Sequence, residues 1–111
     1  MKQIKARFYR TASGSEPVRE WLLALSKEDR KAIGTDIATV EFGWPIGLPV
    51  CRPMGKGLYE VRTDLPGKRT ARVLFTIVED TMVLLHGFIK KSRRTLKSDL
   101  NLAQVRKADV T

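Results

Sequence analysis

The sequence predicts one α+β domain whose element order is strand, two helices, three strands and one helix. Apolar and polar residues alternate near the N-terminus, as in a strand with one buried face. Apolar residues then recur at helical spacing over two segments, and three strand-like runs separated by turn residues follow. A length of 111 residues, of which 42% are hydrophobic, allows one modest core, so we expect a single domain over residues 1–111.

The first half of the chain begins with the alternating strand, expected over residues 2–9. Ser15 is a suitable N-cap for the first helix, and Pro17 is tolerated in a first helical turn. Ser26 opens a capping-box pattern that predicts the start of the second helix. Together the two segments predict a helical hairpin. Residues 43–57 are rich in Gly and Pro, and they predict a loop.

The second half of the chain predicts a meander followed by a helix. Strands are expected over residues 58–63, 70–78 and 82–89, with turn residues between them. The last two runs are apolar on both faces, so they are expected at the centre of the sheet. The first strand can join this meander only after the helical hairpin crosses one face of the sheet. Thr95 is the expected N-cap of the C-terminal helix.

The charge of the chain is strongly positive and unevenly distributed. Lys and Arg number 21 and Asp and Glu number 12, which gives a net charge of +9. Residues 1–50 hold 8 basic and 6 acidic side chains, whereas residues 51–111 hold 13 and 6, a net charge of +7. Positive charge attracts nucleic acid, the ribosome, anionic membranes and acidic proteins. An anion-binding surface is therefore expected mainly in the second half.

The composition disfavours several classes of protein. Cys51 is the one cysteine and cannot form an intramolecular disulfide, and with His86 as the one histidine the chain lacks the ligands of a structural zinc site. We expect neither a metal nor a cofactor. No apolar run approaches the ~20 residues that span a bilayer, and the N-terminus lacks the apolar stretch of a signal peptide. The expected location is the cytoplasm, without a membrane partner.

Two arginines are the first candidates for chemistry. With a turn centred near Gly67, Arg62 falls opposite Arg72 in a hairpin, to within one residue of register. Like charges directly opposed on a sheet are destabilising, so an anion bound between the two arginines would explain them. The alternative is that each arginine pairs with a carboxylate, such as Glu60 or Asp64, or faces water.

Other features each have a functional and a structural interpretation. Lys56 lies between two glycines that would let it approach a phosphate closely, or it is a solvated turn lysine. His86 either exchanges protons near neutral pH or is a core histidine bonded to a backbone carbonyl. The basic run at residues 90–94 is either a solvated face or one wall of a groove at the sheet edge. Cys51 has no activating group in the sequence, and we interpret it as structural.

Three motifs in order give the chain a resemblance to a known family. They are GLYEVR at residues 57–62, TARVLF at residues 70–75 and LLHGFIKKS at residues 84–92. From about residue 55 onward the chain resembles the HigB-type branch of the RelE/ParE toxin superfamily. These are phage- and plasmid-associated toxins of type II toxin–antitoxin modules. Residues 1–50 match the family in element order.

The resemblance implies a RelE-like fold with a small twisted antiparallel sheet, an N-terminal helical hairpin and a C-terminal helix. It also implies a metal-independent endoribonuclease that cleaves messenger RNA on the ribosome (an mRNA interferase) and is inhibited by a cognate antitoxin of helix-turn-helix type. The superfamily also contains ParE-type toxins that bind DNA gyrase without nuclease activity, and this is the alternative function. A basic RNA-binding module is a third, but the sequence shows no interleaved aromatic residues for stacking bases.

The resemblance further implies roles for individual residues. Arg62 and Arg72 match the strand arginines that face the scissile phosphate, and Lys56 matches the basic position before the Gly-Leu-Tyr motif. These three cations would stabilise the charge that develops on the phosphate oxygens. The candidates for proton transfer are Lys90, Lys91, Glu60 and His86. The candidates for further RNA contacts are Lys68, Arg69, Arg93 and Arg94.

Overall fold

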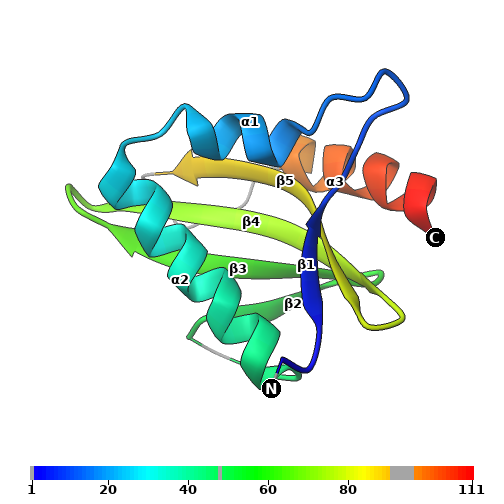
Figure 1. The fold of residues 1–111 in the computed structure, drawn as a ribbon, viewed down its shortest axis with the longest axis horizontal. Coiled ribbons are helices and arrows are strands. Elements are labelled where there is room, and N and C mark those ends of the chain that lie inside the picture. Colours follow the sequence, from blue (N-terminus) through cyan, green and yellow to red (C-terminus); the bar gives the residue numbers. More distant parts are fainter. Residues whose placement is uncertain (1, 48, 91–96) are drawn as a thin grey trace.

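The computed structural model describes residues 2–47, 49–90 and 97–111 (Figure 1). In chain order the elements are β1 (Lys5–Phe8), α1 (Pro17–Leu23), α2 (Lys27–Gly43), β2 (Cys51–Gly55), β3 (Leu58–Leu65), β4 (Arg69–Val78), β5 (Thr81–Lys90) and α3 (Lys97–Val110). Over the described ranges the strands form one five-stranded sheet in the order β1-β5-β4-β3-β2. The predicted α+β class is confirmed. None of the helices in these ranges is both long and apolar enough to cross a membrane.

The sheet is mixed, which corrects the expectation of an antiparallel sheet. β1 pairs in parallel with β5, so that Lys5 lies opposite Thr81 and Phe8 opposite Leu84. The β2–β3, β3–β4 and β4–β5 pairings are antiparallel. Local alternation predicts that residues 2–9 contain a strand but not which neighbour the strand takes. The choice of β5 places β4 and β5 inside the sheet, as their apolar faces predict.

Part of the segment predicted as a loop is an edge strand. Cys51–Gly55 forms β2, in which Cys51 lies opposite Val61 of β3. The register shifts between Pro53 and Gly55. Proline cannot donate a hydrogen bond to a neighbouring strand, and a sheet edge tolerates it for that reason. The Gly and Pro content of this segment is therefore compatible with an edge strand at Cys51–Gly55.

The two N-terminal helices do not pack on each other as a hairpin, which corrects the predicted layout. α1 contacts mainly β5 and β1, whereas α2 contacts mainly β3 and β1. Both helices lie on the same face of the sheet, and α3 packs on the other face (Figure 1). We call these the α1/α2 face and the α3 face. Each helix is held by the sheet, because its apolar residues are directed there rather than toward the other helix.

The predicted helix starts have different outcomes. Ser26 caps α2 as predicted, since its Oγ accepts a hydrogen bond from the backbone N–H of Asp29 at 3.1 Å. Ser15 does not cap α1, because its Oγ lies 2.8 Å from Oγ1 of Thr11 in the preceding turn, and the N-cap position belongs to Glu16. The predicted cap of α3, Thr95, lies outside the described residues.

The core has two parts, one on each face of the sheet. Ile33 and Val40 of α2 pack over Val73 and Phe75 on the α1/α2 face. Leu74, between these two strand residues, points to the α3 face, where the packed residues include Leu58, Leu85 and Ala103. Successive strand residues point to opposite faces, so β4 contributes to both parts of the core. This confirms the central position predicted for β4.

Candidate functional site

The candidate site lies on the α3 face, beside the N-terminal turn of α3. The register there brings two rows of side chains together across the strands. One row contains Arg52, Glu60, Leu74 and His86, on β2, β3, β4 and β5 respectively. The next contains Arg62, Arg72 and Phe88. The predicted opposition of Arg62 and Arg72 is therefore confirmed without a shift in register.

A buried ion pair lies at the centre of this surface. Nη1 of Arg72 lies 3.6 Å from Oε2 of Glu60, and the two side chains are 1% and 2% exposed. Arg52 approaches the same carboxylate from the solvent side, with Nη2 at 3.4 Å from Oε1 and 44% of its side chain exposed. Breaking a buried ion pair typically costs ~3–5 kcal/mol. The carboxylate of Glu60 thus joins one buried arginine to one exposed arginine.

Arg62 is the exposed member of the predicted arginine pair. Its side chain is 48% exposed, and its Nε lies 3.6 Å from Oδ1 of Asp64. A solvent-exposed ion pair of this kind contributes only ~0–1 kcal/mol, so Arg62 can leave Asp64 at little cost. The structure therefore confirms that each arginine of the pair has a carboxylate neighbour, Glu60 for Arg72 and Asp64 for Arg62.

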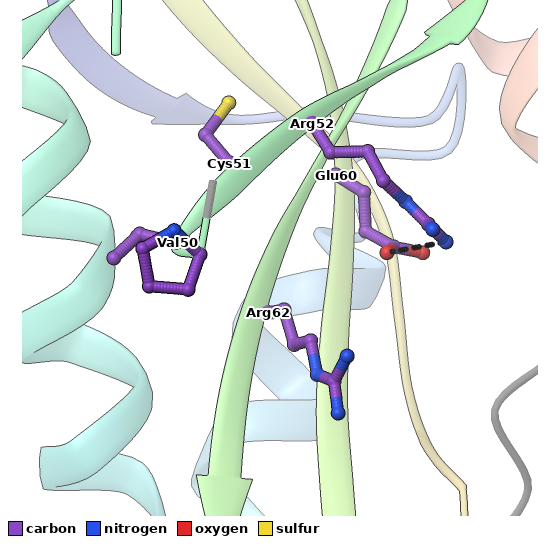
Figure 2. Close-up of a pocket in the computed structure, with 6 residues that line it drawn as sticks. Val50, Cys51, Arg52, Glu60 and Arg62 are labelled. Atoms are coloured by element: carbon purple, nitrogen blue, oxygen red, sulfur yellow. Dashed lines mark hydrogen bonds and ion pairs between the residues drawn. The ribbon is translucent and has the colours of Figure 1, made fainter. Parts of the chain in front are cut away.

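Arg52, Glu60 and Arg62 line one small pocket (Figure 2). It is lined by Pro49, Val50, Cys51, Arg52, Glu60 and Arg62. Arg52 and Glu60 point toward each other on one side of it, and Arg62 extends from the same strand as Glu60. Arg52 was not among the candidates from the sequence. A strand paired with β3 would have placed Arg52 opposite Glu60. This strand was not predicted, because residues 43–57 were interpreted as a loop.

Cys51 borders the pocket, but its side chain belongs to the core on the α1/α2 face. Figure 2 shows it directed away from Arg52 and Glu60. Burial, with a smaller contribution from the negative charge of Glu60, raises the pKa of the Cys51 thiol to about 11. The thiol is therefore protonated at neutral pH and is not a nucleophile, which supports the structural interpretation.

His86 bonds a carboxylate rather than a backbone carbonyl. Its Nε2 lies 2.7 Å from Oδ1 of Asp99, in the first turn of α3. Nζ of Lys90 lies 3.8 Å from Oδ2 of the same carboxylate. The ring of His86 also stacks on Phe88, with ring centroids 5.3 Å apart. Sequence reasoning missed Asp99, because an acidic residue in a first helical turn is ordinarily explained by the helix dipole.

Lys56 is not brought to the Glu60–Arg72 pair. It is exposed in the β2–β3 turn, with a φ of 53° between Gly55 (φ 88°) and Gly57 (φ 77°). Lys56 lies four positions before Glu60 in the sequence, which is ~13 Å at the rise per residue of a strand. It instead lines a groove with Lys97 of α3. The position of Lys56 suits a contact with an anionic group away from the pocket.

Arg69 is bound by Asp29 on the α1/α2 face. Its Nη1 lies 2.8 Å from Oδ2 of Asp29 and its Nη2 lies 3.3 Å from Oδ1. These hydrogen bonds lower the pKa of the Asp29 carboxyl and raise that of the Arg69 guanidinium. They link the β3–β4 hairpin to α2, which gives Arg69 a structural role. Lys68, also proposed for RNA binding, is exposed in the hairpin turn.

Three sequence-predicted site residues, Lys91, Arg93 and Arg94, lie outside the described residues. Within the described ranges, His, Cys, Asp and Glu side chains form no group of three or more that could hold a metal ion. The groups available at the pocket are two exposed guanidiniums and a carboxylate. A planar guanidinium can bind two oxygens of one phosphate, so the arrangement suits a phosphodiester.

Comparison with known proteins identifies one family. The family model described as Phage derived protein Gp49-like (DUF891) matches residues 20–108, which include the pocket residues and α3 up to Ala108. No curated protein matches the chain at a significant level. Because the family match spans well over half of the sequence, the chain belongs to the phage-derived Gp49-like family.

Proposed function

We propose that this chain is the HigB-type toxin of a type II toxin–antitoxin module and that it inhibits translation by cleaving messenger RNA on the ribosome. Membership of the Gp49-like family, a RelE-like toxin family, supports the toxin class. The observation that carries the nuclease is the pocket in which the exposed Arg52 and Arg62 flank the carboxylate of Glu60. The proposed partners are the ribosome, messenger RNA and an antitoxin of helix-turn-helix type.

Cleavage without a metal requires a group that binds the phosphate. In the proposed reaction the 2′-hydroxyl of the RNA attacks the adjacent phosphorus, and negative charge builds up on the non-bridging oxygens. Arg52 and Arg62 are the arginines of the pocket that solvent reaches, and they bind these oxygens. Fixed cations aimed at developing charge are usually the largest single contribution to such a rate. Arg72, which is almost fully buried, acts through Glu60 and is a positioning residue.

The reaction also needs a base and an acid. Glu60 is held at the pocket by Arg52 and Arg72, and its carboxylate takes the proton of the 2′-hydroxyl. His86 lies two strands away on the same face, ~10 Å at the usual strand spacing, and donates a proton to the departing 5′-oxygen. The scissile bond would lie between them. The positive charge of residues 51–111 supports binding of ribosomal RNA around this site.

The test is primer extension on a defined messenger RNA in a purified translation system, with and without ribosomes. Wild-type protein is compared with Arg52→Ala and Arg62→Ala, and with Arg19→Ala as a control on the exposed surface of α1. Loss of one such cationic contact costs ~3–4 kcal/mol elsewhere, so we expect each pocket variant to cleave ~100-fold more slowly or worse. The Arg19→Ala control should cleave at the wild-type rate.

Absence of cuts under every condition would contradict the nuclease proposal. A DNA gyrase supercoiling assay with the same protein would then test the ParE-type alternative. If both pocket variants cleave at the wild-type rate, the protein is a nuclease but its active site is not this pocket.

A further inference from the structure

The first turn of α3 holds the imidazole of His86 through a carboxylate. Nε2 of His86 lies 2.7 Å from Oδ1 of Asp99, and each side chain is only 17% exposed. An ionised carboxylate can only accept hydrogen bonds. The shared hydrogen is therefore on Nε2, which leaves Nδ1 of the neutral ring with its lone pair.

Other contacts restrict the same ring. Phe88 stacks on it with an angle of 29° between the ring planes. Nζ of Lys90 lies 3.8 Å from Oδ2 of Asp99 and 5.7 Å from the centre of the Phe88 ring. Asp99 thus contacts both candidate proton-transfer groups of β5. Among the described residues, the hydrogen bond of the imidazole is made by Nε2.

We propose that Asp99 is a positioning residue for proton transfer by His86, and this inference rests on the proposed nuclease function. Asp99 holds the neutral ring in its Nε2–H tautomer and stabilises the ring when both nitrogens are protonated. The proton on Nδ1 passes to the 5′-oxygen as the bond from phosphorus to that oxygen breaks. The bond from the 2′-oxygen to phosphorus forms in the same reaction, and its proton goes to Glu60. His86 is left neutral, with its hydrogen still on Nε2.

A purely structural role for Asp99 predicts different behaviour, and the chain offers a matched control. Asp109, near the other end of α3, accepts a hydrogen bond from the hydroxyl of Tyr9. Asp109 therefore ties α3 to Tyr9, as Asp99 ties it to His86 and Lys90. Asp109 lies ten residues from Asp99, which is ~15 Å along a helix, and touches none of the proposed catalytic groups. Asp109→Asn removes the negative charge from this docking contact of α3 without changing a group that contacts His86.

The first experiment determines which tautomer the imidazole of His86 adopts, and it needs no nuclease activity. The chain has a single histidine, so the ring nitrogens of His86 can be followed without ambiguity by ¹⁵N NMR. In the neutral ring of wild-type protein we expect a protonated Nε2 and an unprotonated Nδ1. Asp99→Ala should give a mixture of both tautomers, whereas Asp109→Asn should match the wild type. A protonated Nδ1 in the neutral wild-type ring, or an unchanged tautomer in Asp99→Ala, would overturn the proposal.

The second experiment measures single-turnover cleavage on programmed ribosomes, together with ribosome affinity and thermal unfolding. We expect Asp99→Asn to lower the cleavage rate ~10-fold or more, within the ~10²–10⁴-fold that a positioned proton-transfer group supplies, without weakening ribosome binding. Asp99→Glu should restore part of the rate, and Asp109→Asn should stay within ~2-fold of wild type. Equal losses of rate and stability in Asp99→Asn and Asp109→Asn would mean that Asp99 only docks α3. If wild-type protein does not cleave at all, the proposed function fails, and the tautomer measurement still decides whether Asp99 holds the Nε2–H form of His86.

Discussion

On the α1/α2 face of the sheet the interiors of the described strands are uncharged, and charged groups lie near the ends of elements. Asp29 near the start of α2 bonds Arg69 at the start of β4, and Glu41 near the end of α2 accepts the backbone N–H of Ala6 at 2.7 Å. On the α3 face a buried Glu60–Arg72 pair lies within the strands. Burying charge inside a sheet costs desolvation energy that a hydrophobic pair avoids. This contrast supports the proposed site on the α3 face, which carries this cost.

The largest expected effect comes from substitutions that test whether the buried Glu60–Arg72 pair stabilises the fold. Arg72→Met alone leaves Glu60 buried beside a neutral side chain, so we expect the free energy of unfolding to fall by ~3–5 kcal/mol. The double variant Glu60→Leu/Arg72→Met should recover most of this loss or exceed wild type, yet remain unable to cleave RNA. Urea unfolding and the ribosome cleavage assay would measure the two properties. A double variant as unstable as the single one would show that the pair stabilises this fold.

The two sides of β2 differ in their surroundings, because the thiol of Cys51 faces the core while Arg52 faces the pocket. The chemical reactivity of Cys51 tests this difference. With a pKa of about 11, the thiol should be alkylated at pH 8 on the order of 100-fold more slowly in the folded protein than in urea. Burial of the sulfur slows the folded protein further. The rate of iodoacetamide labelling, followed by mass spectrometry, measures this ratio. Comparable rates in both states would contradict the inert environment assigned to this side of the strand.

The smallest expected effect concerns the ion pair between Asp29 and Arg69 on the α1/α2 face. The pKa of Asp29 is lowered in the folded state, so the carboxylate contributes stability that is complete above its unfolded pKa of ~3.9 and is lost as the pH falls through the folded value. Asp29→Asn should therefore be less stable than wild type at pH 7, and the difference should shrink below pH ~4. Thermal unfolding of both proteins from pH 7 to pH 3 measures this. A difference that persists unchanged at pH 3 would mean that the pair is not the cause.

Local patterns were sufficient for much of the α3-face geometry. The turn residues between the strand-like runs at 58–63 and 70–78, centred near Gly67, predicted the hairpin register that places Arg62 opposite Arg72. Hairpin partners lie close in sequence, so the turn largely determines their pairing. The same patterns predicted the Ser26 cap and the central position of β4 and β5.

Contacts between distant segments could not be predicted in this way. The parallel pairing of β1 with β5, the use of Cys51–Gly55 as an edge strand and the separate docking of α1 and α2 all depend on which surfaces meet in three dimensions. The approach of Arg52 to Glu60 and of Asp99 to His86 follows from these choices. Residue periodicity reports which side of an element is buried, whereas the identity of the neighbour is decided when the whole core packs. The amino-acid pattern thus determined most of the elements, with β2 as the exception, and tertiary packing decided which charged groups share one pocket.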